Sequence, residues 1–354
     1  MTSVMPGSFA ESVALLPGDV VTAIAGKETV DIATLRAALR FGARTDEVIV
    51  DVTRDGVPHQ AHGRAVRVED ETFAGGTVRY GALRRGGLLL RTITTVPESP
   101  GPHPLVVFFQ GISCVSLDFA GRPVPPIGRI LHELSARGLA TLRLERRGLG
   151  DSEGPPCESI DFATEVADLI ALTSSASSPL CFFGHSIGGM MLPLVARANP
   201  PRAAIAAGAT RVRWSECMAG STRRQLLLRG ASDVEADAGA AAEAAAIARA
   251  APNDVLFGRT GTFREQLQNA CIADAYAELA CPLLVVHGEH DWVASEDEAR
   301  DLATLPDAEL VVVPGMDHAF GHHVSCDESG GAYGQGTFEP LLVDRIESFV
   351  RRHS

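Results

Sequence analysis

A serine flanked by glycines is the residue of this sequence best suited to attack a carbonyl carbon. The segment Gly184-His185-Ser186-Ile187-Gly188 follows an apolar run and precedes a helical one. Glycines at both ends remove side chains where a strand and a helix pinch together, so the serine can occupy a sharp, exposed turn. Its hydroxyl would lie at a helix N-terminus, where developing negative charge is stabilised. The pattern predicts that Ser186 is a nucleophile.

A serine hydroxyl needs a general base, and the base needs an acid that orients it. His318 follows an apolar strand predicted over Ala308–Val313. Asp291 lies in the loop after the strand predicted over Pro282–His287. Asp317 adjoins the histidine, but neighbouring side chains of a loop rarely point the same way. We therefore expect His318 to be the base and Asp291 to be the acid.

The strand, G-x-S-x-G turn and helix, followed by an acid and then a histidine, resemble the α/β-hydrolase superfamily. The resemblance runs from about Phe73 to the C-terminus, and the general look is similar to esterases and acylaminoacyl-peptidase-like hydrolases. It implies an α/β fold in which helices cover both faces of a mostly parallel central sheet.

The resemblance also implies an oxyanion hole made of two backbone N–H groups. One belongs to Ile187, the residue after the nucleophile. The other belongs to Ile112 in the segment Gln110-Gly111-Ile112-Ser113, where many relatives have His-Gly. One such donor contributes roughly 2.7–4 kcal/mol to catalysis in a comparable hydrolase.

Apolar runs alternate with helical segments after Pro104, which is the pattern of a mostly parallel sheet. The predicted strands of this region are Leu105–Phe109, Ala140–Leu144, Leu180–Phe183, Ala203–Ala207, Pro282–His287 and Ala308–Val313. Helices are predicted to begin at Ile127, Ile160, Ile187 and Ser295 and near Phe338. Two antiparallel strands, Thr77–Tyr80 and Leu88–Thr95, are expected before them.

The segment from Arg211 to Ala280 is too long for a simple crossover between two strands. It contains an alanine-rich, strongly helical stretch, Val234–Ala251, followed by Pro252–Asn269. We expect a helical cap, about residues 211–280, inserted into the hydrolase domain of residues 73–354.

Residues 1–68 have a separate organisation. A turn and strand around Pro17-Gly18-Asp19, a helix over Ile32–Leu39, a strand over Val48–Val52 and a hairpin at Arg54-Asp55-Gly56 resemble a PDZ domain. The loop and strand that capture a peptide usually precede the Pro6-Gly7-Ser8 segment. The prediction is an incomplete PDZ-like domain, a packing or docking module, followed by a polar link at residues 69–72.

Composition limits the partners. The formal net charge is -13 and Lys27 is the only lysine, so nucleic acid is an unfavourable ligand. Neither a signal peptide nor a membrane-spanning run is visible. The cysteines are scattered, odd in number and never spaced C-x-x-C, which we interpret as reduced thiols in a cytoplasmic protein. Cys114 and Cys157 are expected on loops near the mouth of the site, without a nucleophilic role.

Two further sets of residues could suggest other chemistry. Several histidines surround the predicted base, but no H-E-x-x-H motif or matching cysteine set accompanies them, so no metal is expected. The segment Arg146–Gly154 resembles the R-G-x-G-x-S-x-G loop of the superfamily. We interpret its acidic residues, Asp151 and Glu153, as structural.

These residues predict a serine hydrolase that cleaves a carboxylic ester or thioester, and a secondary metabolite is the kind of substrate we expect. A small-molecule acyl group would be carried by Ser186 and released by water that His318 activates, with no cofactor. A peptidase or amidase stays open, as does acyl transfer or cyclisation with a nucleophile other than water. A scaffold based on the PDZ-like module, or a homo-oligomer or protein partner bound through it, is a further alternative.

Overall fold

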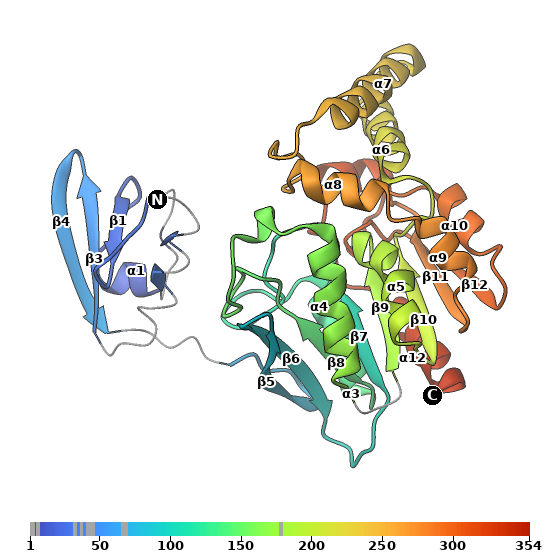
Figure 1. Cartoon of the computed structure of the whole chain (residues 1–354), viewed down its shortest axis with the longest axis horizontal. Coiled ribbons are helices and arrows are strands. Elements are labelled where there is room, and N and C mark those ends of the chain that lie inside the picture. The colour runs from blue at the N-terminus through green and yellow to red at the C-terminus, as the bar shows by residue number, and fades with distance from the viewer. Residues whose placement is uncertain are drawn as a thin grey trace.

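The computed structural model describes residue 4 and residues 8–30, 34–35, 38–39, 47–64, 70–176 and 180–354. Figure 1 shows a small N-terminal unit in blue and a larger layered domain in colours from teal to red. None of the described helices combines the length and the apolar character that crossing a membrane requires.

Among the described residues, the larger domain contains an eight-stranded sheet of order β12-β11-β10-β9-β7-β8-β6-β5. Its strands are β5 (Gly76–Arg85), β6 (Leu88–Pro97), β7 (Leu105–Phe109), β8 (Ala140–Leu144), β9 (Leu180–His185), β10 (Ala203–Ala207), β11 (Leu283–Gly288) and β12 (Ala308–Val313). The strands from β12 to β8 are parallel, whereas β6 pairs antiparallel with β8 and with β5. The predicted mostly parallel sheet is therefore confirmed, with β7 to β12 within two residues of their expected ends.

The central strands are apolar on both faces because helices cover both faces. Val107 and Phe109 of β7 belong to one apolar cluster, and Val106 and Phe108 belong to the other. The helices packed on the first cluster include α4 (Phe162–Ser174), α5 (Ile187–Ala198), α9 (Ile272–Ala277) and α10 (Glu296–Leu302). The second cluster is covered by α3 (Pro126–Ala136) and α12 (Leu341–His353). Two short elements, η1 (Cys157–Ser159) and α11 (Cys326–Gly331), lie in loops.

The segment predicted as a helical insertion is helical. It contains α6 (Trp214–Leu228), α7 (Asp233–Arg249) and α8 (Gly261–Gln268), followed by α9. Ser232 begins α7 with a capping box, since its hydroxyl accepts the N–H of Glu235 while the glutamate accepts the N–H of Ser232. Ala236 is the buried side chain of α7, so this helix stands largely in solvent against α6.

The N-terminal unit has its own small core. Its elements are α1 (Phe9–Ser12), β1 (Val20–Ile24), β2 (Lys27–Glu28), β3 (Glu47–Arg54) and β4 (Val57–Arg64). The strands form an antiparallel sheet of order β2-β1-β3-β4. Asp19 accepts two hydrogen bonds of 2.7 Å from Arg54, and this holds the pKa of the carboxyl far below its usual range. The helix expected over Ile32–Leu39 falls largely outside the described residues, so the PDZ-like character stays a prediction.

Two expectations are wrong at the level of residues. Glu71, placed in a polar link, is 4% exposed and packs inside the hydrolase domain.

Cys114 and Cys157, expected to be reduced, form a disulfide. They are 43 positions apart in the sequence, but the loop after β7 and the segment η1 meet in space and bring their Cα atoms within 5.8 Å. Sequence spacing alone does not reveal such a meeting.

Candidate active site

Ser186 occupies the sharp turn between β9 and α5. Its backbone has φ 54° and ψ -121°, a positive-φ conformation that residues with a side chain rarely adopt. A Cβ atom at Gly184 would lie 2.6 Å from the carbonyl oxygen of Gly188. A Cβ atom at Gly188 would lie 2.0 Å from the carbonyl oxygen of Phe109. Both glycines are therefore required by the close packing of the strand, the turn and the helix.

His318 and Asp291 lie together, although 27 residues separate them. The Nδ1 atom of His318 is 2.8 Å from Oδ2 of Asp291, and both side chains are buried. The other carboxylate oxygen accepts the N–H groups of Val293 and Ala294 at 2.8 and 2.9 Å. Burial would raise the pKa of Asp291, but the neighbouring His318 and these donors outweigh it and lower the pKa. The carboxylate is thus charged and fixed beside the imidazole.

Asp317, the competing carboxylate, faces away from that pair. Its Oδ2 lies 2.9 Å from Nε2 of His323, and its Oδ1 accepts the N–H of Gly321 at 2.7 Å. The N–H of Gly334 also donates to it at 2.9 Å. Asp317 therefore holds its own loop in shape.

His185 is a contact that sequence reasoning missed. Its Nε2 donates to the carbonyl oxygen of His318 at 2.7 Å, since a carbonyl only accepts. Desolvation of the ring and the nearby His318 lower its pKa to about 3, so it is neutral at pH 7. The residue before the serine thus holds the backbone of the predicted base. Its place next to the nucleophile in the G-x-S-x-G motif is the sequence feature that could have indicated this role.

Ser186, Ile187, Ile112 and His318 line one cavity of about 570 Å³. This volume is in the range of small-molecule sites. The wall is formed largely by apolar and aromatic side chains from the loop after β7, from the insertion and from the loops after β11 and β12. They include Val115, Phe119, Ile127, Trp214, Met218, Phe257, Trp292 and Tyr333. The side chains suited to acyl chemistry therefore open into a space for an apolar group.

The loop Gln110–Phe119 carries the expected second donor, Ile112, and we call it the oxyanion loop. A Cβ atom at Gly111 would lie 3.2 Å from Cβ of Ser186, so this glycine lets the loop approach the nucleophile. Its later half is held by two buried carboxylates. Glu145 accepts the N–H of Leu117 at 2.9 Å, and Glu71 accepts the N–H of Phe119 at 2.9 Å.

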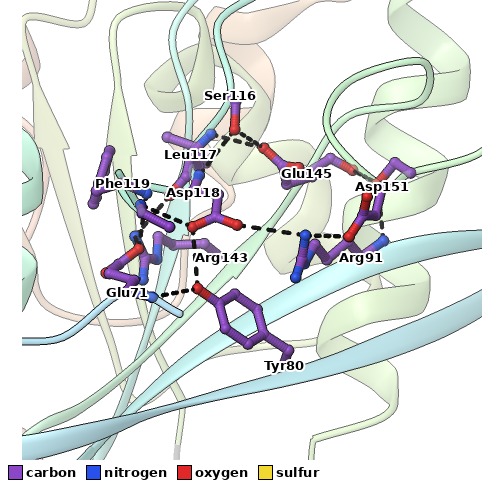
Figure 2. A network of polar contacts seen from close by, with 12 residues as sticks. Glu71, Tyr80, Arg91, Ser116, Leu117, Asp118, Phe119, Arg143, Glu145 and Asp151 are labelled. Atoms are coloured by element: carbon purple, nitrogen blue, oxygen red, sulfur yellow. Dashed lines mark hydrogen bonds and ion pairs between the residues drawn. The ribbon is translucent and has the colours of Figure 1, made fainter. Parts of the chain in front are cut away.

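Figure 2 shows how far this polar support extends beneath the oxyanion loop. Arg143 is fully buried; it donates to Glu71 at 2.8 Å and to the carbonyl oxygen of Leu117 at 2.7 Å. Burial would raise the pKa of Glu71, but hydrogen bonds from His132 and Arg143 and the charge of the arginine lower it to about 2. Burial raises the pKa of Glu145.

The acidic residues of the Arg146–Gly154 segment face the sheet edge. Asp151 pairs with Arg91 of β6, and Glu153 accepts the N–H of Leu89 at 2.9 Å. This agrees with a structural role for both. Over the described part of the chain, no group of three or more histidine, cysteine, aspartate or glutamate residues could hold a metal ion.

The strand order and the serine turn after β9 define an α/β-hydrolase. The family model described as serine aminopeptidase, S33 (Hydrolase_4), matches residues 126–322, which is more than half of the sequence. The chain belongs to this family. The matched residues include Ser186, Asp291 and His318.

Esterase EstD of Thermotoga maritima is similar in sequence, with 22% identity over 233 residues. The match covers 63% of this chain and 56% of EstD, so it spans little more than half the length of that relative. EstD is named an esterase, and the family is one of hydrolases.

Two solved structures share the fold. Est1E of Butyrivibrio proteoclasticus, with bound ferulic acid, has a TM-score of 0.55 at 19% identity and covers 77% of this chain and 98% of its own. Mouse alpha/beta hydrolase domain-containing protein 10 has a TM-score of 0.51 at 16% identity. That match covers 78% of this chain and 100% of the mouse chain.

Proposed function

We propose that this chain is a serine esterase that forms an acyl-enzyme on Ser186. The observation that carries the proposal is His318, paired with the buried Asp291, at the wall of the cavity that holds the serine turn. His318 takes the proton of the serine hydroxyl as it attacks the carbonyl carbon, and then gives it to the leaving alcohol or thiol. Water activated by His318 then releases the acid.

The oxyanion of each tetrahedral intermediate is bound by the N–H groups of Ile187 and Ile112. Asp291 keeps the histidine in the tautomer that carries its proton on Nδ1, which leaves Nε2 free to act as a base. No cofactor enters these steps. The support for this assignment is the position of Gly111 against Ser186 and the start of α5 at Ile187.

The proposed substrate is a neutral carboxylic ester or thioester with an apolar acyl or aryl group. Trp214, Phe257 and Trp292 supply aromatic surface. Among the described residues that line the cavity, Arg122 is the one charged side chain apart from the histidines. Such a wall suits an uncharged group better than the ammonium of a peptide amino terminus. Est1E binds an aromatic acid on the same fold, so aryl esters belong in the first substrate panel.

Aminopeptidase activity is the second candidate, because the family description names it. A panel of p-nitrophenyl and aryl esters, acyl thioesters and aminoacyl amides ranks the two by kcat/KM. Mass spectrometry of the products separates hydrolysis from acyl transfer or cyclisation, which a role in secondary metabolism would allow. A protein partner or second copy bound through the PDZ-like unit stays a proposal for the N-terminal residues.

The test of the mechanism is covalent labelling with a fluorophosphonate, followed by peptide mapping. We expect the label on Ser186 alone. Ser186→Ala should abolish labelling and lower turnover of an activated ester roughly 10⁵–10⁶-fold. Ser232→Ala is the matched control, because Ser232 also stands at a helix N-terminus but caps α7. Labelling that survives Ser186→Ala would overturn the assignment.

A further inference from the structure

Arg146 binds three carbonyl oxygens of the oxyanion loop. Its Nη2 donates to the carbonyl of Gln110 at 3.1 Å and to that of Gly111 at 2.5 Å. Its Nη1 donates to the carbonyl of Ser113 at 2.7 Å. The side chain is 9% exposed; its bonds to Gln110 and Gly111 are partly buried, and the bond to Ser113 lies at the surface. The planar guanidinium therefore spans the beginning of the loop as one rigid fork.

Arg259 binds the carbonyl that Arg146 leaves out. It lies between α7 and α8 of the insertion, and its Nε donates to the carbonyl oxygen of Ile112 at 2.9 Å. Its Nη1 donates to the carbonyl of Cys157 at 2.8 Å, beside the disulfide. The side chain is fully buried. Four successive carbonyls, from residue 110 to residue 113, thus accept hydrogen bonds from two arginines.

Glu165 of α4 joins the two arginines. Its Oε1 accepts from Nη2 of Arg259 at 2.6 Å, and its Oε2 lies 3.0 Å from Nε of Arg146. Burial lowers the pKa of Arg146 to about 10, with the carboxylate opposing this and Arg259 adding to it, so the guanidinium stays charged at neutral pH. Two buried cations share one buried anion, which leaves positive charge behind the oxyanion loop.

The C=O and N–H of a trans peptide point in opposite directions within one plane. The carbonyl of Gly111 and the N–H of Ile112 belong to the same peptide unit. When Arg146 fixes that carbonyl, it also fixes the direction of the N–H that the proposed mechanism uses. Arg259 does the same for the next peptide unit. Donation to the carbonyl also polarises the peptide and strengthens its N–H as a donor.

From these contacts we infer that Arg146 and Arg259, joined by Glu165, are positioning residues that aim the oxyanion-hole N–H of Ile112. The inference rests on the proposed function. It gives the helical insertion a role in the chemical step, because Arg259 brings part of that insertion onto the oxyanion loop. Substrate selection alone does not require such a contact.

The test replaces each arginine with methionine, which keeps an unbranched stem and removes the donors. Arg146→Met should lower kcat on a small activated ester about 100-fold, since a misplaced donor costs roughly that much. Arg259→Met should lower it about 10-fold. Arg223→Met is the matched control: this arginine of α6 pairs with two carboxylates, Asp233 and Asp237, away from the loop. It should leave kcat within about twofold of the parent.

A second measurement separates positioning from loss of fold. A trifluoromethyl ketone forms an oxyanion on Ser186, so its affinity should fall in Arg146→Met by the same factor as kcat/KM. Affinity for the carboxylic acid product should change less than about threefold. Arg146→Lys keeps the charge but not the fork, and its kcat should stay below about a tenth of the parent.

Glu165→Gln leaves both arginines in place and should lower kcat by an intermediate factor. Unchanged ketone affinity in Arg146→Met, or full activity in Arg146→Lys, would overturn the inference. Failure of the proposed function would look different, because the unaltered protein would then neither hydrolyse the ester nor take the phosphonate label.

Discussion

The oxyanion loop and the loop that carries Asp291 both contribute residues to the wall of the same cavity, and they are held in different ways. Residues 110–119 depend on side chains from other segments: two arginines on the carbonyls, buried carboxylates on the later N–H groups, and a disulfide at Cys114. The acid loop, residues 289–295, is tied at its start to other segments, since the N–H groups of Glu289 and His290 donate to the carbonyls of Val313 and Met316, but the N–H and Oδ1 of Asp291 make local bonds. The N–H of Asp291 donates to Gly288, and its side chain accepts two N–H groups of the following residues.

The difference has a consequence for where substitutions act. An aspartate that is oriented by local hydrogen bonds should be sensitive mostly to changes within its own loop. An oxyanion loop held from outside should respond to residues far away in the sequence. The activity of variants at distant residues should therefore differ between the two loops.

The largest effect should come from within the acid loop. Asp291→Asn should lower turnover on the order of 10⁴-fold, because the amide favours the wrong tautomer of His318. Asp317→Asn is the matched control at a carboxylate that also contacts a histidine. We expect it to lower the melting temperature but to keep turnover within about tenfold of the parent. Steady-state kinetics measure the turnover of both variants. A greater loss of turnover in Asp317→Asn would show that Asp317 is the acid.

Loss of the disulfide tests the external support of the oxyanion loop. A double Cys114→Ser/Cys157→Ser variant should lose about 2–4 kcal/mol of unfolding free energy, and its kcat should fall roughly tenfold as the loop loosens. Cys217→Ser is the control variant at the acid loop, since this buried thiol lies 3.9 Å from the carbonyl oxygen of Val293. For both variants, urea unfolding measures the free energy of unfolding and steady-state kinetics measure kcat. Equal losses in the two variants would contradict the comparison.

A smaller effect is expected where the insertion contacts the acid loop. Arg224 of α6 donates to the carbonyl oxygens of Trp292 and Val293 at 3.0 and 2.6 Å. Arg224→Met should lower kcat less than about fivefold, because the local bonds of Asp291 remain. If its loss equals that of Arg146→Met, the orientation of Asp291 also depends on residues outside its loop and the contrast disappears.

Glu71, which supports the oxyanion loop, should also make the free energy of unfolding depend on pH in the acid range. The pKa of Glu71 is lowered to about 2 from 4.5, so its stabilising contribution is complete above pH 4.5 and is lost as the pH falls toward 2. The difference in unfolding free energy between the parent and Glu71→Gln should shrink over that window and be constant above it. Urea titrations from pH 2.5 to 7 test this, and a difference independent of pH would contradict it.

The sequence predicted what depends on short-range patterns. Apolar runs located β7 to β12, and the glycines around Ser186 located the turn, because both follow from the spacing of neighbouring residues. The same spacing placed His318 and Asp291 after their strands, and the structure brings their side chains to 2.8 Å. Glu71 was assigned to a link because its polar neighbours gave no sign of the buried arginine it meets.

The supports of the oxyanion loop were missed for a physical reason. Arg259 reaches Ile112 across 147 positions, and Arg146 reaches Gly111 across 35. No periodicity relates such pairs, and a single arginine has no signature that distinguishes a buried fork from a solvated charge. The disulfide was missed for the same reason, since scattered cysteines do not reveal which loops meet.

The bond between Cys114 and Cys157 also sets a condition on how active protein is made. Thiol–disulfide exchange with glutathione keeps most such pairs reduced in a cytosol, whereas secretory compartments allow them to form. Protein made in a reducing host would lack the disulfide and have a less constrained oxyanion loop. Protein made in an oxidising host would have the disulfide and a fixed loop. The cytoplasmic location stays a prediction. Batches prepared in the two kinds of host should differ in specific activity until an oxidant is added.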